Sequence, residues 1–196
     1  MKRTCDIILS AIGLLCLSPL LLLVALWVKL DSPGPVFYRQ VRVGRNNQDF
    51  RIYKFRSMYT DSDKRGLITI GGRDPRVTHA GYYIRKFKLD ELPQLLNVLV
   101  GDMSFVGPRP EVRKYVNLYT PEQMHVLDVR PGITDAASIK YRNENDILAT
   151  QPEPERYYIE VIMQDKLRIN LDYVANHTIR GDLRLILNTF LAIIIK

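Results

Sequence analysis

The stretch Lys88-Leu89-Asp90-Glu91-Leu92-Pro93-Gln94-Leu95-Leu96-Asn97 joins two adjacent acids to the start of an apolar run with helical spacing. Proline is tolerated in a helix only in the first turn, where its missing N–H has no intrahelical partner. Pro93 therefore places Asp90 at about the N-cap and Glu91 at about the first position of a predicted helix whose apolar run covers residues 92–100. A helix N-terminus stabilises carboxylates and attracts phosphate, so the pair is either a structural cap or part of a phosphate-handling site.

The composition limits the kind of protein. The chain of 196 residues fits one domain with a core of its own. Its net charge of +7 and pI near 9.4 indicate anionic partners, which include nucleic acid, phosphate-bearing substrates and acidic membrane surfaces. Cys5 and Cys16 lie in or beside an apolar segment, which predicts a reducing compartment and no disulfide framework. The histidines show no metal-ligand spacing, and the sequence has no P-loop or G-x-G-x-x-G motif.

Towards the N-terminus, residues 7–28 read IILSAIGLLCLSPLLLLVALWV and carry no charge. A straight helix of this length would reach about 33 Å, which is enough to cross a hydrocarbon core of about 30 Å. The run is longer than the apolar region of a cleavable signal peptide. We therefore expect a membrane element that is retained in the protein.

Ser18-Pro19 lies near the middle of this run. Proline removes a helix hydrogen bond and bends the axis, and the serine hydroxyl can satisfy a carbonyl freed at the bend. Basic residues flank both ends of the run, which favours a re-entrant helix that enters and leaves on one face. A kinked helix that crosses once stays the alternative. Asp6 follows Arg3 by three residues, which predicts a neutralising helical pair.

The middle of the chain predicts a basic β-hairpin. Residues 36–44 and 50–58 both have the pattern of strands, and a polar turn separates them. Arginine and lysine side chains, among them Lys54 and Arg56, alternate with aromatic ones. Such a hairpin is suited to binding RNA, lipid headgroups or a phosphorylated substrate, although a solvated basic hairpin has the same pattern.

Two segments connect the hairpin to the acid pair. Residues 61–81 are polar and rich in glycine, and they predict a long functional loop. Residues 81–88 predict a basic helix that carries Arg85 and leads the chain to Asp90.

Two prolines bracket Arg109 in the segment Gly107-Pro108-Arg109-Pro110 and fix the backbone around one guanidinium. A rigidly held arginine suits bidentate recognition of phosphate. A structural salt bridge from Arg109 to Asp102 or Glu111 is the alternative.

The C-terminal part of the chain is helical in pattern. Residues 155–163 and 166–174 predict two short amphipathic helices. The last helix, which begins near residue 180 and becomes strongly apolar over 190–195, is suited to the membrane interface.

Several of these pieces occur together in one known family. They are Lys2-Arg3 with Asp6 ahead of the proline-broken helix, Pro33-Gly34-Pro35-Val36-Phe37-Tyr38-Arg39-Gln40, Lys54-Phe55-Arg56-Ser57-Met58, Leu89-Asp90-Glu91-Leu92-Pro93-Gln94, Asp102-Met103-Ser104-Phe105-Val106-Gly107-Pro108-Arg109-Pro110 and Arg130-Pro131-Gly132-Ile133-Thr134. In this order they closely resemble the bacterial sugar transferases, the small monotopic phosphoglycosyl transferases. The resemblance covers nearly the whole chain.

The resemblance implies a fold and an activity. The fold is α+β and mostly helical, with a re-entrant membrane helix in residues 1–30, broken at Ser18-Pro19, and an integrated cytoplasmic catalytic domain in residues 31–196 with a small β-hairpin and interfacial amphipathic helices. The enzyme lies at the bacterial inner membrane. It moves a phosphosugar from a UDP-sugar to polyprenol (undecaprenyl) phosphate, releases UMP, uses Mg²⁺ and begins glycoconjugate biosynthesis.

The family's acidic pair falls on Asp90-Glu91, where the aspartate is described as the nucleophile that forms a covalent phosphosugar-enzyme. Neighbouring helical side chains project about 100° apart, so the two acids do not share one task. We therefore assign Asp90 as the nucleophile of a ping-pong reaction and Glu91 to metal positioning or proton handling, with both acids available to Mg²⁺. Asp182 matches an acidic position of the family whose role the sequence leaves open. The candidates for phosphate binding are Lys54, Arg56, Arg85, Arg109 and Arg142.

One segment departs from the family pattern. Where many members carry two small glycines after Pro-Gly-Ile-Thr, this chain has Asp135 and Tyr141. The identity of the sugar is therefore not predicted. A homodimer is compatible with the sequence, which leaves the oligomeric state open. A competing hypothesis is a membrane-tethered basic module that binds RNA or anionic lipid. That hypothesis leaves Asp90-Glu91 and Arg109 unexplained, and we expect no nucleic-acid partner.

Overall fold

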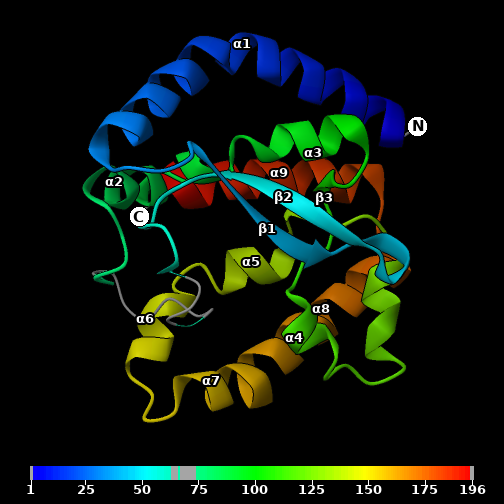
Figure 1. Cartoon of the computed structure of the whole chain (residues 1–196). Coiled ribbons are helices and arrows are strands. Elements are labelled where there is room, and N and C mark those ends of the chain that lie inside the picture. The colour runs from blue at the N-terminus through cyan, green and yellow to red at the C-terminus, as the bar shows by residue number, and fades with distance from the viewer. Residues whose placement is uncertain (1, 63–65, 67–73, 195–196) are drawn as a thin grey trace.

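The computed structural model describes residues 2–62, 66 and 74–194. The described chain is mostly helical and contains two small sheets (Figure 1). In chain order the elements are α1 (Lys2–Asp31), β1 (Phe37–Val43), η1 (Arg45–Asn47), β2 (Asp49–Phe55), α2 (His79–Lys86), η3 (Leu89–Glu91), α3 (Gln94–Val100), β3 (Ser104–Val106), α4 (Arg113–Val116), η4 (Gln123–Asp128), β4 (Gly132–Thr134), α5 (Ala136–Lys140), α6 (Glu144–Ala149), α7 (Pro154–Tyr157), η5 (Tyr158–Ile162), α8 (Met163–Asn176) and α9 (Ile179–Ile194).

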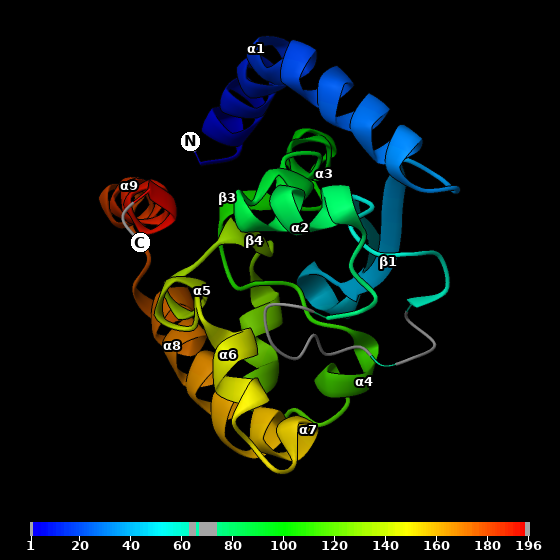
Figure 2. The ribbon, with the colours of Figure 1, turned by 90° about the vertical axis from the view of Figure 1, so that its left-hand side faces the viewer.

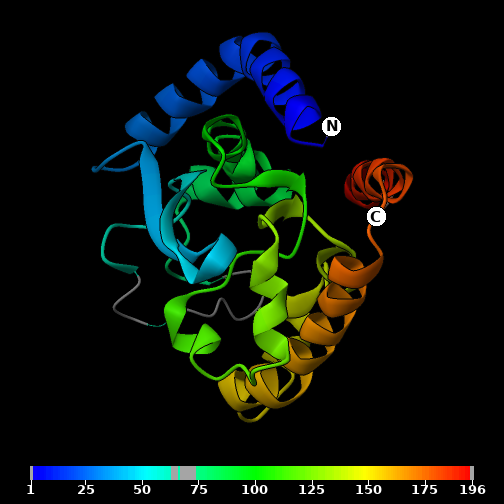
Figure 3. The ribbon, with the colours of Figure 1, turned by 90° about the vertical axis from the view of Figure 1, so that its right-hand side faces the viewer.

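Helix α1 arches over one side of the molecule and bends near its middle (Figures 2 and 3). Pro19 lies inside the helix and leaves the Leu15 carbonyl without its usual donor. The Ser18 hydroxyl donates to that carbonyl at 2.8 Å. By length and composition α1 could cross a membrane, and only 11% of its most apolar window is buried against the protein.

Two charged side chains fasten the first turn of α1 to the body of the protein. Arg3 donates to the carbonyls of Val98 and Leu99 at the end of α3, where cations are favoured. Asp6 accepts from the Ser104 hydroxyl at 3.1 Å and from the Phe105 N–H at 3.2 Å. The predicted pair between Arg3 and Asp6 is therefore wrong, because each side chain finds a partner distant in sequence.

The antiparallel hairpin agrees with the prediction, because β1 lies within residues 36–44 and β2 begins one residue before the predicted 50–58 and ends three residues earlier. A second sheet, the parallel pair of β3 and β4, was not predicted. The chains come so close there that a Cβ on Gly132 would lie 2.2 Å from the backbone nitrogen of Gly107. Glycine at these two positions therefore lets the Gly-Pro-Arg-Pro segment run beside the Arg-Pro-Gly segment.

The C-terminal helices differ from the prediction. The two runs predicted at 155–163 and 166–174 form one helical stretch of α7, η5 and α8, in which η5 is a π-helical turn. The extra residue of a π-helical turn shifts the helix phase. This places Tyr158, Ile162 and Leu167 in one buried cluster. Helix α9 leaves Leu183, Leu187 and Phe190 exposed.

Of the remaining predictions, the helix before the acid pair is found in the structure and the long loop is described only in part. Helix α2 corresponds to the helix predicted over 81–88 and begins two residues earlier. Of the long loop predicted over 61–81, residues 63–65 and 67–73 lie outside the described residues, as do the last two residues of the chain, and residues 79–81 already belong to α2.

Candidate active site

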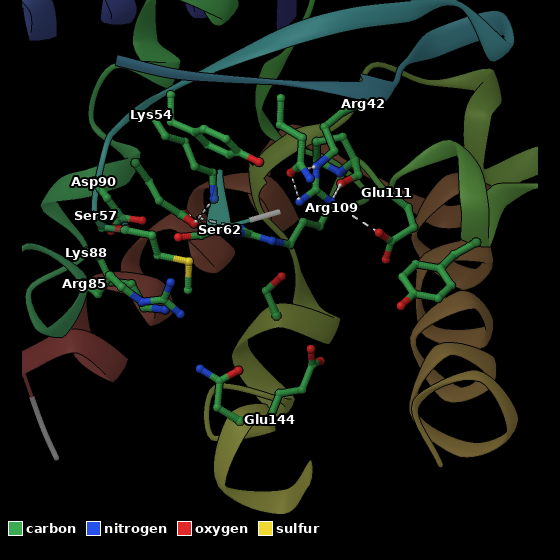
Figure 4. A pocket seen from close by; sticks show the side chains of 18 of the residues that line it. Arg42, Lys54, Ser57, Ser62, Arg85, Lys88, Asp90, Arg109, Glu111 and Glu144 are labelled. Carbon is green, nitrogen blue, oxygen red and sulfur yellow. Dashed lines mark hydrogen bonds and ion pairs between the residues drawn. The ribbon is translucent and has the colours of Figure 1, made fainter. Parts of the chain in front are cut away.

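A cleft of about 590 Å³ lies below the hairpin (Figure 4). It brings together both acids and all five predicted phosphate-binding residues: Lys54, Arg56, Arg85, Asp90, Glu91, Arg109 and Arg142. Figure 4 shows Lys54 and Asp90 on the side of the cleft where Lys88 and Arg85 also lie, and Arg109 beside Arg42 and Glu111 on the other side. Ser18-Pro19 and Asp182 do not line it.

The acid pair lies in a 3₁₀ turn rather than at the N-cap of a regular helix. Lys88 adopts a left-handed φ of +56°, the turn η3 follows it, and α3 begins only after Pro93. The Asp90 side chain caps neither element, so the predicted capping role is wrong. The left-handed residue reorients the chain after α2, and the tighter turn directs both carboxylates into the cleft.

Glu91 is the centre of a partly buried ion cluster. Its Oε1 lies 3.0 Å from Lys54 Nζ and also accepts from Arg109 Nη2, while Oε2 accepts from Arg109 Nη1 at 3.3 Å. Burial acts to raise the pKa of Glu91, but the charges of Arg109 and Lys54 outweigh it and hold this pKa well below its ordinary value. Glu91 is therefore ionised and fixes the positions of two cations.

Asp90 meets the opposite environment. The residue is 9% exposed, and its Oδ1 is buried without a hydrogen-bond partner among the described residues. Burial and the neighbouring charge of Glu91 raise the pKa of Asp90, while Lys54 opposes the rise. A carboxylate with few partners is a better nucleophile than one held by several donors. The two neighbouring acids therefore meet different environments, in which Glu91 is paired with two cations and Asp90 keeps an oxygen without a described partner.

Arg109 is held through its backbone as well as its guanidinium. Its N–H donates at 2.9 Å to Asp135, which also caps α5 by accepting from the Ser138 N–H at 2.6 Å. Neither predicted salt bridge is formed, because Glu111 pairs with Arg42 and Asp102 accepts from Asn97. Asp135, which departs from the family pattern, therefore holds the backbone of Arg109 in place beside the cleft.

The other predicted cations differ in how much of their charge faces the cleft. Arg56 as a whole residue is 4% exposed, and its guanidinium donates to the carbonyls of Val28, Ser32 and Pro35 near the end of α1. These contacts indicate that Arg56 fastens α1. Arg142 lies exposed on the cleft wall and pairs with no described residue. Arg85 and Lys88 line the side nearest Asp90.

Two buried amides on α3 were missed from the sequence. Asn97 accepts from the Tyr53 N–H at 2.9 Å and donates to the Arg51 carbonyl at 2.8 Å, which fastens α3 to the free edge of β2. Gln94 is fully buried, and neither of its amide atoms has a partner among the described residues. Both residues follow the acid pair at helical spacing. A polar residue on an otherwise apolar helix face could have indicated from the sequence that these amides are buried.

Asp182 lies outside the cleft lining, in a separate hydrogen-bond network. It accepts from Lys2 Nζ at 2.6 Å and from the Tyr173 hydroxyl at 2.8 Å, and Lys2 also donates to the Val106 carbonyl. The network connects the start of α1 to the start of α9. The sequence left this role open, and the structure gives Asp182 a connecting one.

Comparison with known proteins agrees with this combination of an apolar bent helix, a small hairpin and a basic cleft around two acids. The profile of the family described as "Bacterial sugar transferase" matches residues 1–196, and the chain belongs to that family. The competing hypothesis of an RNA- or lipid-binding module is therefore not favoured.

Three relatives illustrate the range of the family. The chain is 42% identical over 197 residues to the exopolysaccharide production protein PSS of Rhizobium leguminosarum bv. phaseoli, covering 96% of this chain and 92% of that protein. It is 46% identical over 164 residues to the UDP-N-acetylgalactosamine-undecaprenyl-phosphate N-acetylgalactosaminephosphotransferase of Aeromonas hydrophila, covering 81% of this chain and 39% of the relative. It is 37% identical over 193 residues to the UDP-glucose:undecaprenyl-phosphate glucose-1-phosphate transferase of Escherichia coli (strain K12), covering 96% and 39%. The chain thus spans well under half the length of the last two.

Proposed function

We propose that this protein is a phosphoglycosyl transferase that moves a phosphosugar from a UDP-sugar to undecaprenyl phosphate and releases UMP. The names of two relatives supply both substrates, and they differ in the sugar. One observation in this molecule carries the proposal. The buried carboxylate of Asp90, with one oxygen free of partners, lies in a basic cleft beside an acid that two cations neutralise.

In the proposed reaction, an Asp90 oxygen attacks the β-phosphorus of the UDP-sugar. The bond from that phosphorus to the bridging oxygen breaks, UMP leaves, and Asp90 carries the phosphosugar as an acyl phosphate. A phosphate oxygen of undecaprenyl phosphate then attacks the same phosphorus and regenerates the carboxylate. Two steps suit two substrates of very different solubility, because UMP leaves before the lipid enters.

The cleft supplies the charge that this chemistry needs. A carboxylate that attacks a diphosphate must approach a like charge, so cations must lower the barrier. Glu91 holds Lys54 and Arg109 close to Asp90, and Asp135 fixes the backbone of Arg109. Arg85 and Arg142 line the same cleft, where we assign them to the phosphates. Glu91 thus acts by placing cations.

Magnesium fits this site with the substrate as a partner. Mg²⁺ in phosphate-transfer sites is commonly held by one or two carboxylates plus substrate phosphates. The described residues contain no cluster of three or more acidic, histidine or cysteine ligands. The unpartnered Oδ1 of Asp90 offers one ligand to the ion. The oxygens of Glu91 are already bound by Lys54 and Arg109. When bound, the ion would neutralise charge on the diphosphate.

The shape of α1 supports a re-entrant anchor at the cytoplasmic face of the inner membrane. The two halves of the bent helix slope back toward the same side of the molecule (Figures 2 and 3). Leu15, Leu22 and Leu23, close to the bend, are among its most exposed side chains. A helix with its apolar bend away from the protein and both ends against it fits entry and exit through one leaflet.

The activity is tested by UMP release. The purified chain in micelles is incubated with undecaprenyl phosphate, Mg²⁺ and a panel of UDP-sugars that includes UDP-glucose and UDP-N-acetylgalactosamine. We expect at least one sugar to release UMP in a lipid-dependent way. Failure of the whole panel, while a relative of established activity works in parallel, would overturn the proposal.

The nucleophile is tested by the Asp90→Asn variant with Asp146→Asn, an exposed acid on α6, as the matched control. We expect Asp90→Asn to lose turnover by at least about three orders of magnitude, since it removes the attacking group. It should also lose the labelled covalent adduct that forms with UDP-sugar alone, whereas the control keeps both. Adduct that persists in Asp90→Asn would assign the nucleophile elsewhere.

A further inference from the structure

A second cavity of about 180 Å³ lies beside the first turn of α1 and shares no lining residue with the catalytic cleft. Its charged lining is mostly basic, with Lys2, Arg3, Arg45 and Arg130 against Asp6 and Asp128. The basic residues come from three separate parts of the chain, which are the first turn of α1, the hairpin turn and the segment after η4, so the fold assembles this charge.

Two of these arginines have donors that no described residue uses. Arg45 Nε donates to the Asp128 carbonyl at 3.1 Å, and Arg130 Nε donates to the Gly101 carbonyl at 2.8 Å. Each guanidinium is thereby oriented through one nitrogen. The terminal nitrogens of both make no hydrogen bond or ion pair with the described residues. Two oriented guanidinium groups on one small cavity suit an oxygen-rich anion.

The other charges around the cavity are largely engaged. Lys2 binds Asp182 and Tyr173, and Arg3 binds the end of α3. Asp6 accepts from Ser104 and Phe105, and Asp128 Oδ2 lies 2.8 Å from His125. The free hydrogen-bonding capacity of the charged lining therefore belongs mainly to the two arginines.

The cavity lies where a membrane surface would be. Lys2 and Arg3 occupy the first turn of α1, immediately before the uncharged run that begins at Ile7. His177, at the junction of α8 and α9, lines the cavity too, and α9 presents its exposed apolar side chains just beyond. The start of α1 and the start of α9 lie side by side (Figures 1 and 2). Headgroup phosphates would occur at this depth if α1 enters the bilayer.

We propose that this cavity is a phosphate-group site, in which Arg45 and Arg130 bind the phosphate of a phospholipid headgroup or free phosphate. The site is separate from catalysis. It would hold the start of α1 and the tip of the hairpin at the membrane surface. The proposal does not depend on which sugar the cleft transfers.

The test uses the full chain in neutral detergent micelles. Native mass spectrometry or calorimetry measures the Kd in three arms, which are dihexanoyl phosphatidylglycerol, inorganic phosphate and dihexanoylglycerol, a lipid without phosphate. We expect phosphatidylglycerol to bind with one site that dihexanoylglycerol does not occupy. Comparison with inorganic phosphate distinguishes the two sources, because a headgroup site prefers the lipid and a free-phosphate site binds both equally or prefers the ion.

The paired variant Arg45→Gln with Arg130→Gln should raise the Kd of the preferred ligand at least about tenfold, because both bidentate donors are lost. The charge-matched control is Lys114→Gln with Arg156→Gln, which removes two exposed cations from α4 and α7. This control should bind as the unchanged protein does. Arg45→Lys with Arg130→Lys should recover part of the affinity.

Equal affinities in the glutamine pair and its charge-matched control would overturn the proposal, as would a phosphate-independent response to dihexanoylglycerol. If the glutamine pair melts far below the control pair without ligand, Arg45→Gln alone replaces it, because Arg45 is exposed in the hairpin turn.

Discussion

Asp90 and Glu91 are neighbours in the chain, yet their side chains meet different surroundings. Glu91 contacts two cations, whereas Asp90 keeps one buried oxygen without a partner. Burying a negative charge costs free energy at both positions. The ion pairs of Glu91 offset this cost, whereas Asp90 has no comparable partners. Burial also lowers the pKa of Lys54, and the charge of Glu91 opposes that effect. The three groups behave as one electrostatic unit in which each sets the charge of the others.

Removing Lys54 should make activity more sensitive to acid. Lys54 lowers the pKa of Asp90, so Lys54→Met should raise that pKa further. Attack requires the carboxylate, and the acid limb of the kcat profile should therefore move to higher pH, with at least about a tenfold loss of kcat. UMP release measured from pH 5 to pH 9 checks this. Lys54→Arg, which keeps the charge, is the control, and an unmoved limb in Lys54→Met would contradict the coupling.

Asp90 should also lower the stability of the folded protein at neutral pH. Burial raises the pKa of Asp90 in the folded protein above its value in the unfolded chain. The stability that the protonated carboxyl contributes is therefore complete only below the unfolded pKa. It is lost as the pH rises through the folded pKa, because the buried group must then ionise. We expect Asp90→Asn to raise the free energy of unfolding on the order of 1 kcal/mol at pH 7.5. The gain should disappear near pH 4. Thermal unfolding in micelles at both pH values measures it, and an equal gain at both would point to a different cause.

At the scale of elements, α1 and α3 are held by polar side chains at their ends and edges. Arg56 binds the carbonyls near the end of α1, Arg3 binds those at the end of α3, and Asn97 joins α3 to β2. Helix ends leave carbonyls without intrahelical donors, and buried ends require partners. The arginines that the sequence presented as one basic class are thus divided between fastening helices and lining the cleft.

The topology of α1 is testable with a cysteine that the chain already carries. Cys5 lies near one end of the helix, and Leu30→Cys, in a Cys16→Ser background, places a second thiol near the other. We expect a membrane-impermeant maleimide to label both positions from the same face of oriented vesicles. The variant Ser18→Leu with Pro19→Leu should straighten the helix and move one label to the opposite face. Labelling of the unchanged helix from opposite faces would restore a single crossing.

The helices and strands differ in how well the sequence predicted them. Strands β1 and β2 were predicted because their alternation is local, and α2 because its pattern spans two turns. The pair of β3 and β4 was not, because strands of three residues carry no periodicity. At the site, the motifs named the acids and the cations, but the roles of Asp135 and Asn97 depend on contacts with distant segments. No spacing rule along the chain reports such contacts.

Over the whole molecule, the bond between Lys2 and Asp182 joins the first helix to the last. The two side chains are 33% and 11% exposed, so water screens the pair only partly. Tyr173 donates to the same carboxylate and receives a hydrogen bond from Lys2. Lys2, Tyr173 and Asp182 therefore form a small, partly buried hydrogen-bond network at the edge of the protein.

A double-mutant cycle measures this connection. Lys2→Met and Asp182→Asn should each lower the free energy of unfolding by about 1–3 kcal/mol, because each leaves a partly buried charge without its partner. The double variant should lose less than the sum. Thermal unfolding in micelles gives the coupling, with Lys114→Met and Glu155→Gln, an exposed pair, as the matched cycle of near-zero coupling. Additive losses in both cycles would show that Lys2 and Asp182 do not stabilise each other.

The same bond has a consequence for how the protein is made. Lys2 and Asp182 are 180 positions apart, and Arg3 and Asp6 find their partners nearly 100 positions later. At about 5–20 residues per second, a ribosome needs on the order of 10–40 s to bring out Asp182 after Lys2. Helix α1 therefore emerges well before the segments that supply its protein contacts, and it waits for all of them until Asp182 has emerged. During that interval we expect lipid, rather than the rest of the chain, to hold the helix in place.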